Sequence, residues 1–381
     1  MVTNDNSMKN IVIAGYVRTP FTPSGKGGLA KVRPDDLAAA AVQGLLERTA
    51  IDPSDIEDLI LGCAFPEGEQ GLNMGRLVAL LAGLPYSVAG VTVNRFCGSS
   101  MQSIHQAAGA ILMGAGEVFL CAGVESMTRV PMSGFNPLPN PRLTTAGPGA
   151  YISMGETAEI VAKHYQIGRA EQERFALASQ HKADRAQRLG LLNDELVPLA
   201  GVDADSCLRP DTTLEGLAAL APVFDHQGTV TAATSSPLTD GASAVLVCSE
   251  DYAQVNGLEP LARIRSVAVS GCAPEMMGIG PVAASRKALA RAGLAMGDID
   301  IVELNEAFCA QAIACVRELQ IDETRLNLDG GAIALGHPLG ATGARITGKA
   351  AALLKREGKL LALATQCIGG GQGIATVLEA V

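Results

Sequence analysis

The sequence contains no tryptophan and few other aromatic residues, with five Tyr and eight Phe among 381 residues. We therefore do not expect bases to be recognised by stacking on aromatic side chains, and a net charge of −10 argues against a basic surface for nucleic acid. No apolar run approaches the ~20 residues that cross a membrane, and the N-terminal MVTNDNSMKN lacks the basic start and apolar core of a signal peptide. We expect a cytoplasmic protein that binds no nucleic acid and spans no membrane.

Cysteine is plentiful, but the patterns that usually explain it are missing. The nine cysteines form no Cys-x-x-Cys pair and are odd in number, which argues against a secreted disulfide framework and a structural zinc site. What is present is 48% hydrophobic and 18% charged residues, the profile of a chain with a large buried core. At ~150 residues per domain, this length predicts two to three domains.

The two halves of the chain repeat one order of elements. An apolar strand at 11–14, a helix at 36–49, and a short polar turn leading into a second strand at 51–62 form one series. The same order recurs at 262–269, 281–292 and 294–306. The repeat continues with strand 91–94 matching 326–329, helix 102–113 matching 343–354, and strand 118–124 matching 361–367. Apolar strands that alternate with helices predict a mixed or parallel sheet with helices on both faces.

The duplication predicts the domain organisation. Residues 8–123 together with 239–258 form the first half, and 259–381 form the second. Residues 124–238 have no counterpart; they begin with a loop rich in Pro and Gly and continue with helical stretches at 157–164 and 169–189. An insertion of this kind usually supplies a binding surface or a lid.

Two cysteines open into glycine turns after apolar runs. Cys97 precedes Gly98 and a helix that starts near Ser99, and a helix N-terminus lowers the pKa of a thiol. We interpret Cys97 as a nucleophile. Cys367 opens the turn Cys367-Ile368-Gly369-Gly370, and a second thiol held in this way suggests a proton carrier. Glycine-lined turns also offer backbone N–H groups to an oxyanion. Most other cysteines are interpreted as small buried residues.

One histidine and one asparagine complete the candidate site. His337 lies in Gly336-His337-Pro338, within a glycine-rich stretch interpreted as a shaped loop and not as a core element. This loop matches the Cys97 turn in the repeat, so His337 is the predicted base for that thiol. Asn305 follows the strand 301–304, where it either orients a water or an oxyanion, or caps the next helix. The other four histidines are interpreted as structural.

These motifs resemble the thiolase family: the Cys97 turn, Asn305-Glu306-Ala307-Phe308, Gly336-His337-Pro338 and Cys367-Ile368-Gly369-Gly370. The resemblance covers nearly the whole chain. It implies an α/β class with a duplicated thiolase-like fold, in which two αβαβα-layered halves are related by a pseudo-twofold and carry an inserted loop domain.

The resemblance also implies a reaction, which is reversible Claisen chemistry on CoA thioesters. Cys97 attacks the 3-keto carbon of a 3-oxoacyl-CoA after His337 activates the thiol, and Cys367 protonates the departing acetyl-CoA carbanion. An acyl-cysteine then passes its acyl group to CoA. One oxyanion site uses His337 and a water held by Asn305, and the other uses the backbone N–H groups of Cys97 and Gly369.

Further implications concern ligands and partners. CoA is a co-substrate, no cofactor is permanently bound, and the CoA-binding positions are Met154, Ser236, Met277, Ala307 and Phe308. The family assembles as a homodimer or a dimer-based homotetramer, and association with other β-oxidation enzymes is compatible with this chemistry.

The subtype follows from smaller signals. Ser153 stands where the acetoacetyl-CoA-forming branch usually has His, and Arg209–Glu215 and Met277–Pro281 also resemble the degradative 3-ketoacyl-CoA branch. Ala221 departs from the Arg that many relatives carry near the CoA nucleotide, and the segment before Arg209 is short. An acetoacetyl-CoA thiolase is the alternative, and a non-catalytic CoA- or acyl-binding protein is a remote one. A decarboxylating condensing enzyme would need only one cysteine, so Cys367 argues against it.

Overall fold

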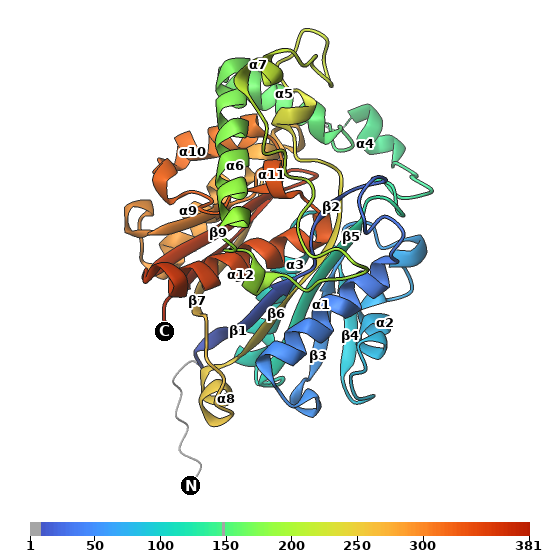
Figure 1. Cartoon of the computed structure of the whole chain (residues 1–381), viewed down its shortest axis with the longest axis vertical. Helices are drawn as coiled ribbons and strands as arrows, with labels where there is room; N and C mark the ends of the chain where they lie inside the picture. The colour runs from blue at the N-terminus through green and yellow to red at the C-terminus, as the bar shows by residue number, and fades with distance from the viewer. Residues whose placement is uncertain (1–8, 147–148) are drawn as a thin grey trace.

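The two halves of the chain lie side by side (Figure 1), and their matching strands follow the same order. The structure is a computed structural model that describes residues 9–146 and 149–381. In the first half the strands lie in the order β4 (Ala89–Val93), β3 (Asp58–Gly62), β5 (Val118–Ser126), β6 (Thr239–Ser249) and β1 (Ile11–Arg18). The short β2 (Thr22–Pro23) pairs with β6.

The second half mirrors this order. It continues from β1 through β7 (Ala262–Gly271), β10 (Gln372–Glu379), β9 (Leu361–Ile368) and β8 (Ile301–Leu304). β5 is parallel to β3 and antiparallel to β6, just as β9 is parallel to β8 and antiparallel to β10. β1 and β7 run antiparallel and join the two sheets. The predicted duplication is therefore confirmed, and its pseudo-twofold passes between β1 and β7.

Helices cover both sheets and fill the space between them. The outer helices of the first half are α1 (Pro34–Thr49) and α2 (Met74–Leu81), and those of the second are α9 (Gly280–Ala292) and α10 (Cys309–Leu319). Between the sheets lie α3 (Ser99–Leu112) and α12 (Leu339–Glu357). Alternation along each strand produces the layers, because neighbouring side chains such as Leu120 and Cys121 enter opposite cores. The predicted αβαβα layering is confirmed.

The central helices α3 and α12 pack closely at their N-terminal ends. The Ala344 N–H donates to Ser100 Oγ at 2.8 Å, and a Cβ on Gly343 would lie 2.3 Å from the Met101 nitrogen. Each contact joins the side-chain position of one residue to the backbone nitrogen of a residue in the other helix, namely Ser100 to Ala344 and Gly343 to Met101. The two contacts are therefore equivalent if Ser100 corresponds to Gly343 in the repeat. The Cys97 and His337 turns therefore correspond as predicted, but the residue equivalent to Cys97 is Gly340 and not His337.

One strand predicted from the repeat is wrong. Residues 326–329 form a single bridge, Leu326 to Val302, followed by a turn. Asn327 has a φ of 44°, and its side chain takes both hydrogen-bonding groups of Leu304, through contacts of 2.9 Å to the N–H and to the carbonyl. The left-handed residue ends the extended chain, so the second half has only this bridge where the first half has β4.

Much of the inserted region lies above the sheets in Figure 1, whereas the segment around Leu196 and Val197 pairs with Arg18 of the first strand. It contains α4 (Pro141–Ala146), α5 (Met154–His164), α6 (Arg169–Arg188) and α7 (Leu214–Ala218), so the two helices predicted there are confirmed as α5 and α6. The remaining helices are α8 (Glu250–Val255) and α11 (Ala332–Leu335). Among the described residues, no helix combines the length and apolar character needed to cross a membrane.

Candidate active site

Cys97 lies in a tight turn between β4 and α3. The strand ends at Val93, earlier than predicted, and Phe96 adopts a left-handed φ of 44°. This conformation is held because the Phe96 N–H donates to Asn94 Oδ1 at 2.8 Å and its carbonyl accepts from Ser99 Oγ at 2.6 Å. The turn places Cys97 just before the first turn of α3, as predicted.

The Cys97 thiol is surrounded by protein, although part of the residue stays accessible. Burial raises its pKa to about 11, while hydrogen bonds from the backbone N–H groups of Gly369 and of Cys97 itself act in the opposite direction. The expected lowering of this pKa by the helix N-terminus is therefore wrong, because desolvation outweighs it. The same contacts place two backbone donors, those of Cys97 and Gly369, around the sulfur.

His337 is buried and held at both ring nitrogens. Its Nδ1 lies 2.6 Å from Thr342 Oγ1, and its Nε2 lies 3.3 Å from Asn305 Nδ2. Because Thr342 Oγ1 donates its own proton to the Pro338 carbonyl at 3.0 Å, the hydroxyl accepts from Nδ1–H. The proton of the neutral ring is thus on Nδ1, and Nε2 carries the lone pair that a base needs.

The surroundings of His337 keep the imidazole neutral. Burial lowers its pKa to about 3, and the nearby Arg345 guanidinium acts in the same direction. The loop was expected to lie outside the core, which is wrong: every residue from 331 to 350 is buried. Small residues make this possible, since a Cβ on Gly340 would lie 2.3 Å from the Val124 carbonyl oxygen.

Asn305 directly follows β8 and lies beside the imidazole. Its backbone N–H donates to the Thr365 carbonyl at 3.0 Å, and its Oδ1 has no hydrogen-bond partner among the described residues. The alternative role as a helix cap is wrong, because α10 begins at Cys309 and its N-cap residue is Phe308. A buried, unpartnered amide oxygen next to His337 is instead available to a ligand or a water.

Cys367 lies near the end of β9, and it is 1% exposed. Burial raises its pKa well above the usual value, with the Cys97 thiol as the next cause. Cys367 packs in one apolar cluster with four of the five predicted CoA-binding residues: Met154, Met277, Ala307 and Phe308. The fifth, Ser236, donates its N–H to the Ala307 carbonyl at 3.0 Å. The structure therefore brings this whole set together around the second thiol.

Three contacts at this site were not predicted from the sequence. Thr342 orients His337, Gln366 donates its side-chain amide to the Cys97 carbonyl, and Glu125 accepts the backbone N–H of Gly340 at 2.9 Å. Thr342 could have been found from its place one helical turn after Pro338, while the other two contacts depend on the tertiary fold.

Of the segments that pointed to the subtype, Ser153 and Arg209–Glu215 lie in the inserted region, whereas Met277–Pro281 lies in the second half at the start of α9. Ser153 caps α5 through reciprocal hydrogen bonds with Glu156, which places Met154 at the first position of this helix. Ala221 lies exposed beyond α7, and Arg209 lies in the loop before it. Cys309 and Cys315 are buried, in agreement with the prediction that they belong to the core.

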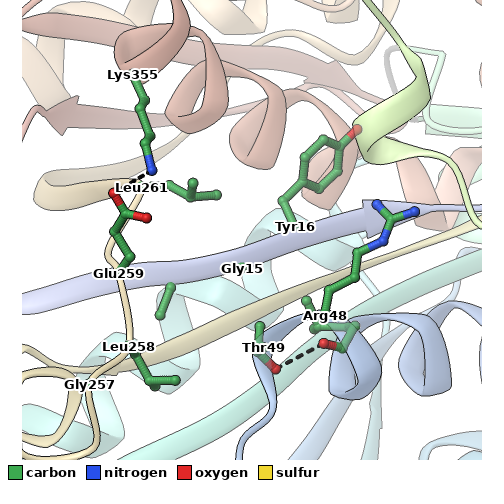
Figure 2. Close-up of a pocket in the computed structure, with 11 residues that line it drawn as sticks. Gly15, Tyr16, Arg48, Thr49, Gly257, Leu258, Glu259, Leu261 and Lys355 are labelled. Atoms are coloured by element: carbon green, nitrogen blue, oxygen red, sulfur yellow. Dashed lines mark hydrogen bonds and ion pairs between the residues drawn. The ribbon is translucent and has the colours of Figure 1, made fainter.

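A separate pocket of about 350 Å³ lies where α1, α12 and the segment before β7 meet (Figure 2). Tyr16, Arg48, Glu259 and Lys355 are among its lining residues, and Lys355 pairs with Glu259 at 2.6 Å. None of the predicted site residues lines this pocket, and its lining has no thiol or imidazole. The candidate chemistry therefore lies elsewhere, at the junction of the Cys97, His337 and Cys367 turns.

A duplicated five-layer α/β fold with two thiols and a buried imidazole at the junction of its halves is that of an acyltransferase. The family model "Thiolase, N-terminal domain" matches residues 11–251, and "Thiolase, C-terminal domain" matches residues 258–380. The chain belongs to the thiolase family. The three-part division predicted from the sequence, with 124–238 as a separate insertion, stays a prediction.

Relatives match over almost the full length. A 3-ketoacyl-CoA thiolase of Aliivibrio fischeri is 49% identical over 386 residues, covering 98% of this chain and 100% of the relative. The enzyme of the same name from Bacillus subtilis is 47% identical over 389 residues, with the same coverage. The crystal structure of human mitochondrial 3-ketoacyl-CoA thiolase in complex with CoA is 38% identical, with a TM-score of 0.90 over 98% of each chain.

Proposed function

We propose that this chain is an acetyl-CoA C-acyltransferase of the 3-ketoacyl-CoA thiolase type. It cleaves a 3-oxoacyl-CoA with CoA to give acetyl-CoA and a chain-shortened acyl-CoA, as in fatty-acid β-oxidation. The observation that carries the proposal is the arrangement of the Cys97 sulfur, which faces the Gly369 N–H and lies close enough to Cys367 to raise the pKa of that thiol. The names of the full-length relatives support the degradative subtype and do not favour an acetoacetyl-CoA thiolase.

In the first half-reaction the Cys97 thiol gives its proton to His337 Nε2 and its sulfur attacks the 3-keto carbon. The new oxyanion is stabilised by His337 and by a water on Asn305, whose amide lies 3.3 Å from the ring. The bond between C2 and C3 then breaks, and its electron pair goes to C2 of the departing acetyl-CoA. Cys367 gives that carbon its proton, which leaves an acyl-thioester on Cys97.

In the second half-reaction the Cys367 thiolate takes the proton of CoA–SH, and the CoA sulfur attacks the acyl-thioester. The oxyanion of this step faces the backbone N–H groups of Cys97 and Gly369, which already converge on the sulfur. Cys97 leaves as a thiolate and recovers its proton from His337. Both thiols and the imidazole return to their starting protonation states.

CoA binding is assigned to the apolar cluster around Cys367, to which α5 contributes Met154. The Phe308 ring contributes with Phe224, which it meets edge to face at 6.0 Å between centroids. We infer that CoA is a co-substrate here and that the thioester end lies against Met277 and Phe308. The absence of a permanently bound cofactor, the cytoplasmic location and an association with other β-oxidation enzymes stay predictions.

A homodimer is the assembly that we propose. β4 is the outermost strand of the first sheet, and Val91 on it is 38% exposed. Further exposed apolar side chains are Leu80 and Leu81 at the end of α2, Tyr86 before β4 and Met113 after α3. An apolar edge of this kind suits pairing with a second copy of the chain. Val91→Lys should yield monomers in analytical ultracentrifugation, and a variant that keeps the wild-type mass would refute this interface.

The proposed reaction is tested by thiolysis of 3-oxoacyl-CoAs of increasing chain length. Cleavage of long as well as short substrates is expected, whereas activity on acetoacetyl-CoA alone would establish the alternative subtype. Cys97→Ala should abolish thiolysis without unfolding the protein. The matched control is Cys248→Ala, which removes a buried thiol of β6 and should retain activity. Equal activity of Cys97→Ala and the wild type would refute the mechanism.

The separate role of the second thiol needs its own measurement. Cys367→Ala should still allow slow acylation of Cys97, because His337 and the Gly369 N–H remain in place. It should block the exchange of the acetyl-CoA methyl protons with solvent, since that exchange needs the proton carrier. Loss of acylation and of exchange to the same extent would show that Cys367 is not a separate carrier.

A further inference from the structure

Glu125 is a buried carboxylate that no step of the proposed mechanism uses. It lies at the end of β5 and is 1% exposed. Its Oε2 accepts two backbone N–H groups, those of Ala64 and Gly340, both at 2.9 Å. Ala64 follows β3 in the first half of the chain, and Gly340 lies in the first turn of α12 in the second. One oxygen atom therefore joins the two halves.

The second oxygen is also occupied by donors. Oε1 accepts from Gln70 Nε2 at 2.7 Å and from the Phe65 N–H at 3.3 Å, and the Cys63 thiol lies 3.8 Å away. No Arg or Lys side chain of the described residues hydrogen-bonds to it. Both oxygens accept hydrogen bonds, and such donors favour the ionised form of a carboxylate. Burial raises the pKa of Glu125, and the N–H donors counteract that effect.

From Ala64 a short chain of hydrogen bonds leads to the nucleophile. The Ala64 carbonyl accepts from Asn94 Nδ2 at 3.0 Å, and Asn94 Oδ1 accepts the Phe96 N–H at 2.8 Å. Phe96 is the left-handed residue directly before Cys97. Cys97 also packs against the apolar cluster that contains Ala64 and Leu339. The Cys97 turn is thus connected to the Glu125 carboxylate through Ala64 and Asn94.

On the other side, the carboxylate holds the loop of the base. Gly340 belongs to the same first helical turn as Thr342, which orients the imidazole of His337. Glycine is required at this position, since a Cβ on Gly340 would lie 2.8 Å from the Gly62 carbonyl oxygen and still closer to that of Val124. The His337 loop therefore packs against the backbone of Gly62 and Val124, and the Gly340 N–H donates a hydrogen bond to Glu125.

We propose that Glu125 is a positioning residue that sets the spacing between the Cys97 turn and the His337 loop through its hydrogen bonds to Ala64 and Gly340. The proposal rests on the proposed thiolase function. Glu125 touches no reacting atom, so its effect reaches the reaction through the alignment of thiol and base. Misplacement by about 1 Å between reacting groups is enough to lower a rate by roughly a hundredfold.

The negative charge gives a second, independent signature. The thiols of Cys63 and Cys97 both lie in its field, which raises the pKa of each. Removal of the charge therefore favours the Cys97 thiolate, even while loss of alignment slows catalysis. A residue that merely held the fold together would change neither the pH dependence of the thiol nor kcat in the folded protein.

Glu125→Gln is the test, because an amide keeps the shape and must direct its NH₂ at one of the two pairs of donors. We expect kcat for 3-oxoacyl-CoA thiolysis to fall by about 10- to 100-fold. The rate of alkylation by iodoacetamide, assigned to Cys97 by peptide mass spectrometry, should show a midpoint at lower pH. Glu125→Asp keeps the charge but is too short to span both turns, so it should lower kcat without moving that midpoint.

Glu250→Gln is the matched control. Glu250 lies at the start of α8, where it accepts a hydrogen bond from Arg263. Its substitution should leave kcat and the pH midpoint of Cys97 alkylation unchanged. If Glu125→Gln does not fold, Gln70→Met removes one donor from Oε1 and should still lower kcat severalfold. The proposal would be overturned if folded Glu125 or Gln70 variants kept the wild-type kcat, or if Glu125→Gln left the pH midpoint of Cys97 alkylation unchanged. Alkylation needs no substrate, so a wild-type protein without thiolase activity would refute the function alone.

Discussion

Replacing Thr342 by Val should convert His337 to the wrong tautomer. The hydroxyl of Thr342 accepts Nδ1–H at 2.6 Å, and Val removes that acceptor with little change in shape. The ring then gains by moving its proton to Nε2, where Asn305 can turn its amide and accept with Oδ1, the atom that now has no partner among the described residues. Nε2 would no longer carry the lone pair that removes the Cys97 proton.

The size of the effect follows from the cost of a buried, unsatisfied donor. That cost is about 1–3 kcal/mol, which corresponds to a fall in kcat of about 5- to 150-fold at 1.36 kcal/mol for each factor of ten. KM should change little, because Thr342 is fully buried below the ring. Steady-state thiolysis measures the loss, and ¹⁵N NMR of the imidazole reports the tautomer. Thr342→Ser keeps the hydroxyl and should stay near the wild-type rate; an equal loss in both variants, or none in Thr342→Val, would refute the reasoning.

Two further predictions concern stability. Burial lowers the pKa of both His105 and His337 to about 3 in the folded protein, whereas an unfolded histidine has a pKa of ~6.5. Between these two values a falling pH protonates the histidines of the unfolded chain but not those of the folded protein. Each histidine therefore lowers the free energy of unfolding by at most about 1.4 kcal/mol per pH unit in this range. Urea unfolding should show stability that is complete above pH 7 and declines steadily toward pH 5; His105→Gln should have a shallower decline, and an identical slope would contradict this account. Gly340→Ala places a Cβ 2.3 Å from a backbone oxygen and should cost roughly 3 kcal/mol, with kcat reduced through the displaced His337 loop. Gly297, whose Cβ would meet nothing within 4 Å, is the matched control, and equal melting temperatures for Gly340→Ala and Gly297→Ala would contradict the steric argument.

The reacting side chains could be found from the sequence because each follows a local rule. Cys97 follows an apolar strand and Cys367 lies near the end of one, each just before glycine, and Asn305 directly follows a strand. The duplication added the alignment of the Cys97 and His337 turns. It placed the turns correctly but not the individual residues, since contacts between α3 and α12 decide the register and no local pattern encodes them.

The groups that support the reacting side chains could not be found in this way. Glu125 reads as an ordinary polar residue after an apolar strand, and its partners Ala64 and Gly340 are 61 and 215 residues away in the sequence. The failed strand at 326–329 has a similar origin. Its alternating apolar residues suit a strand, but Asn327 finds better hydrogen bonds to Leu304 across the fold. Tertiary partners of this kind override local preference.

The lowered pKa expected for Cys97 was wrong for a reason that bears on the mechanism. The helix N-terminus and the Gly369 N–H do favour the thiolate, but burial is the larger effect and leaves the pKa at about 11, while that of His337 is about 3. Thiol and imidazole are therefore both neutral at rest, and a standing thiolate–imidazolium pair is disfavoured. Transfer of the proton becomes favourable only when the negative charge can move on to the 3-keto oxygen of the substrate, which His337 and the water on Asn305 then stabilise. In this site the donors that stabilise the oxyanion are thus also what allows the thiol to ionise, so proton transfer and attack on the 3-keto carbon proceed together.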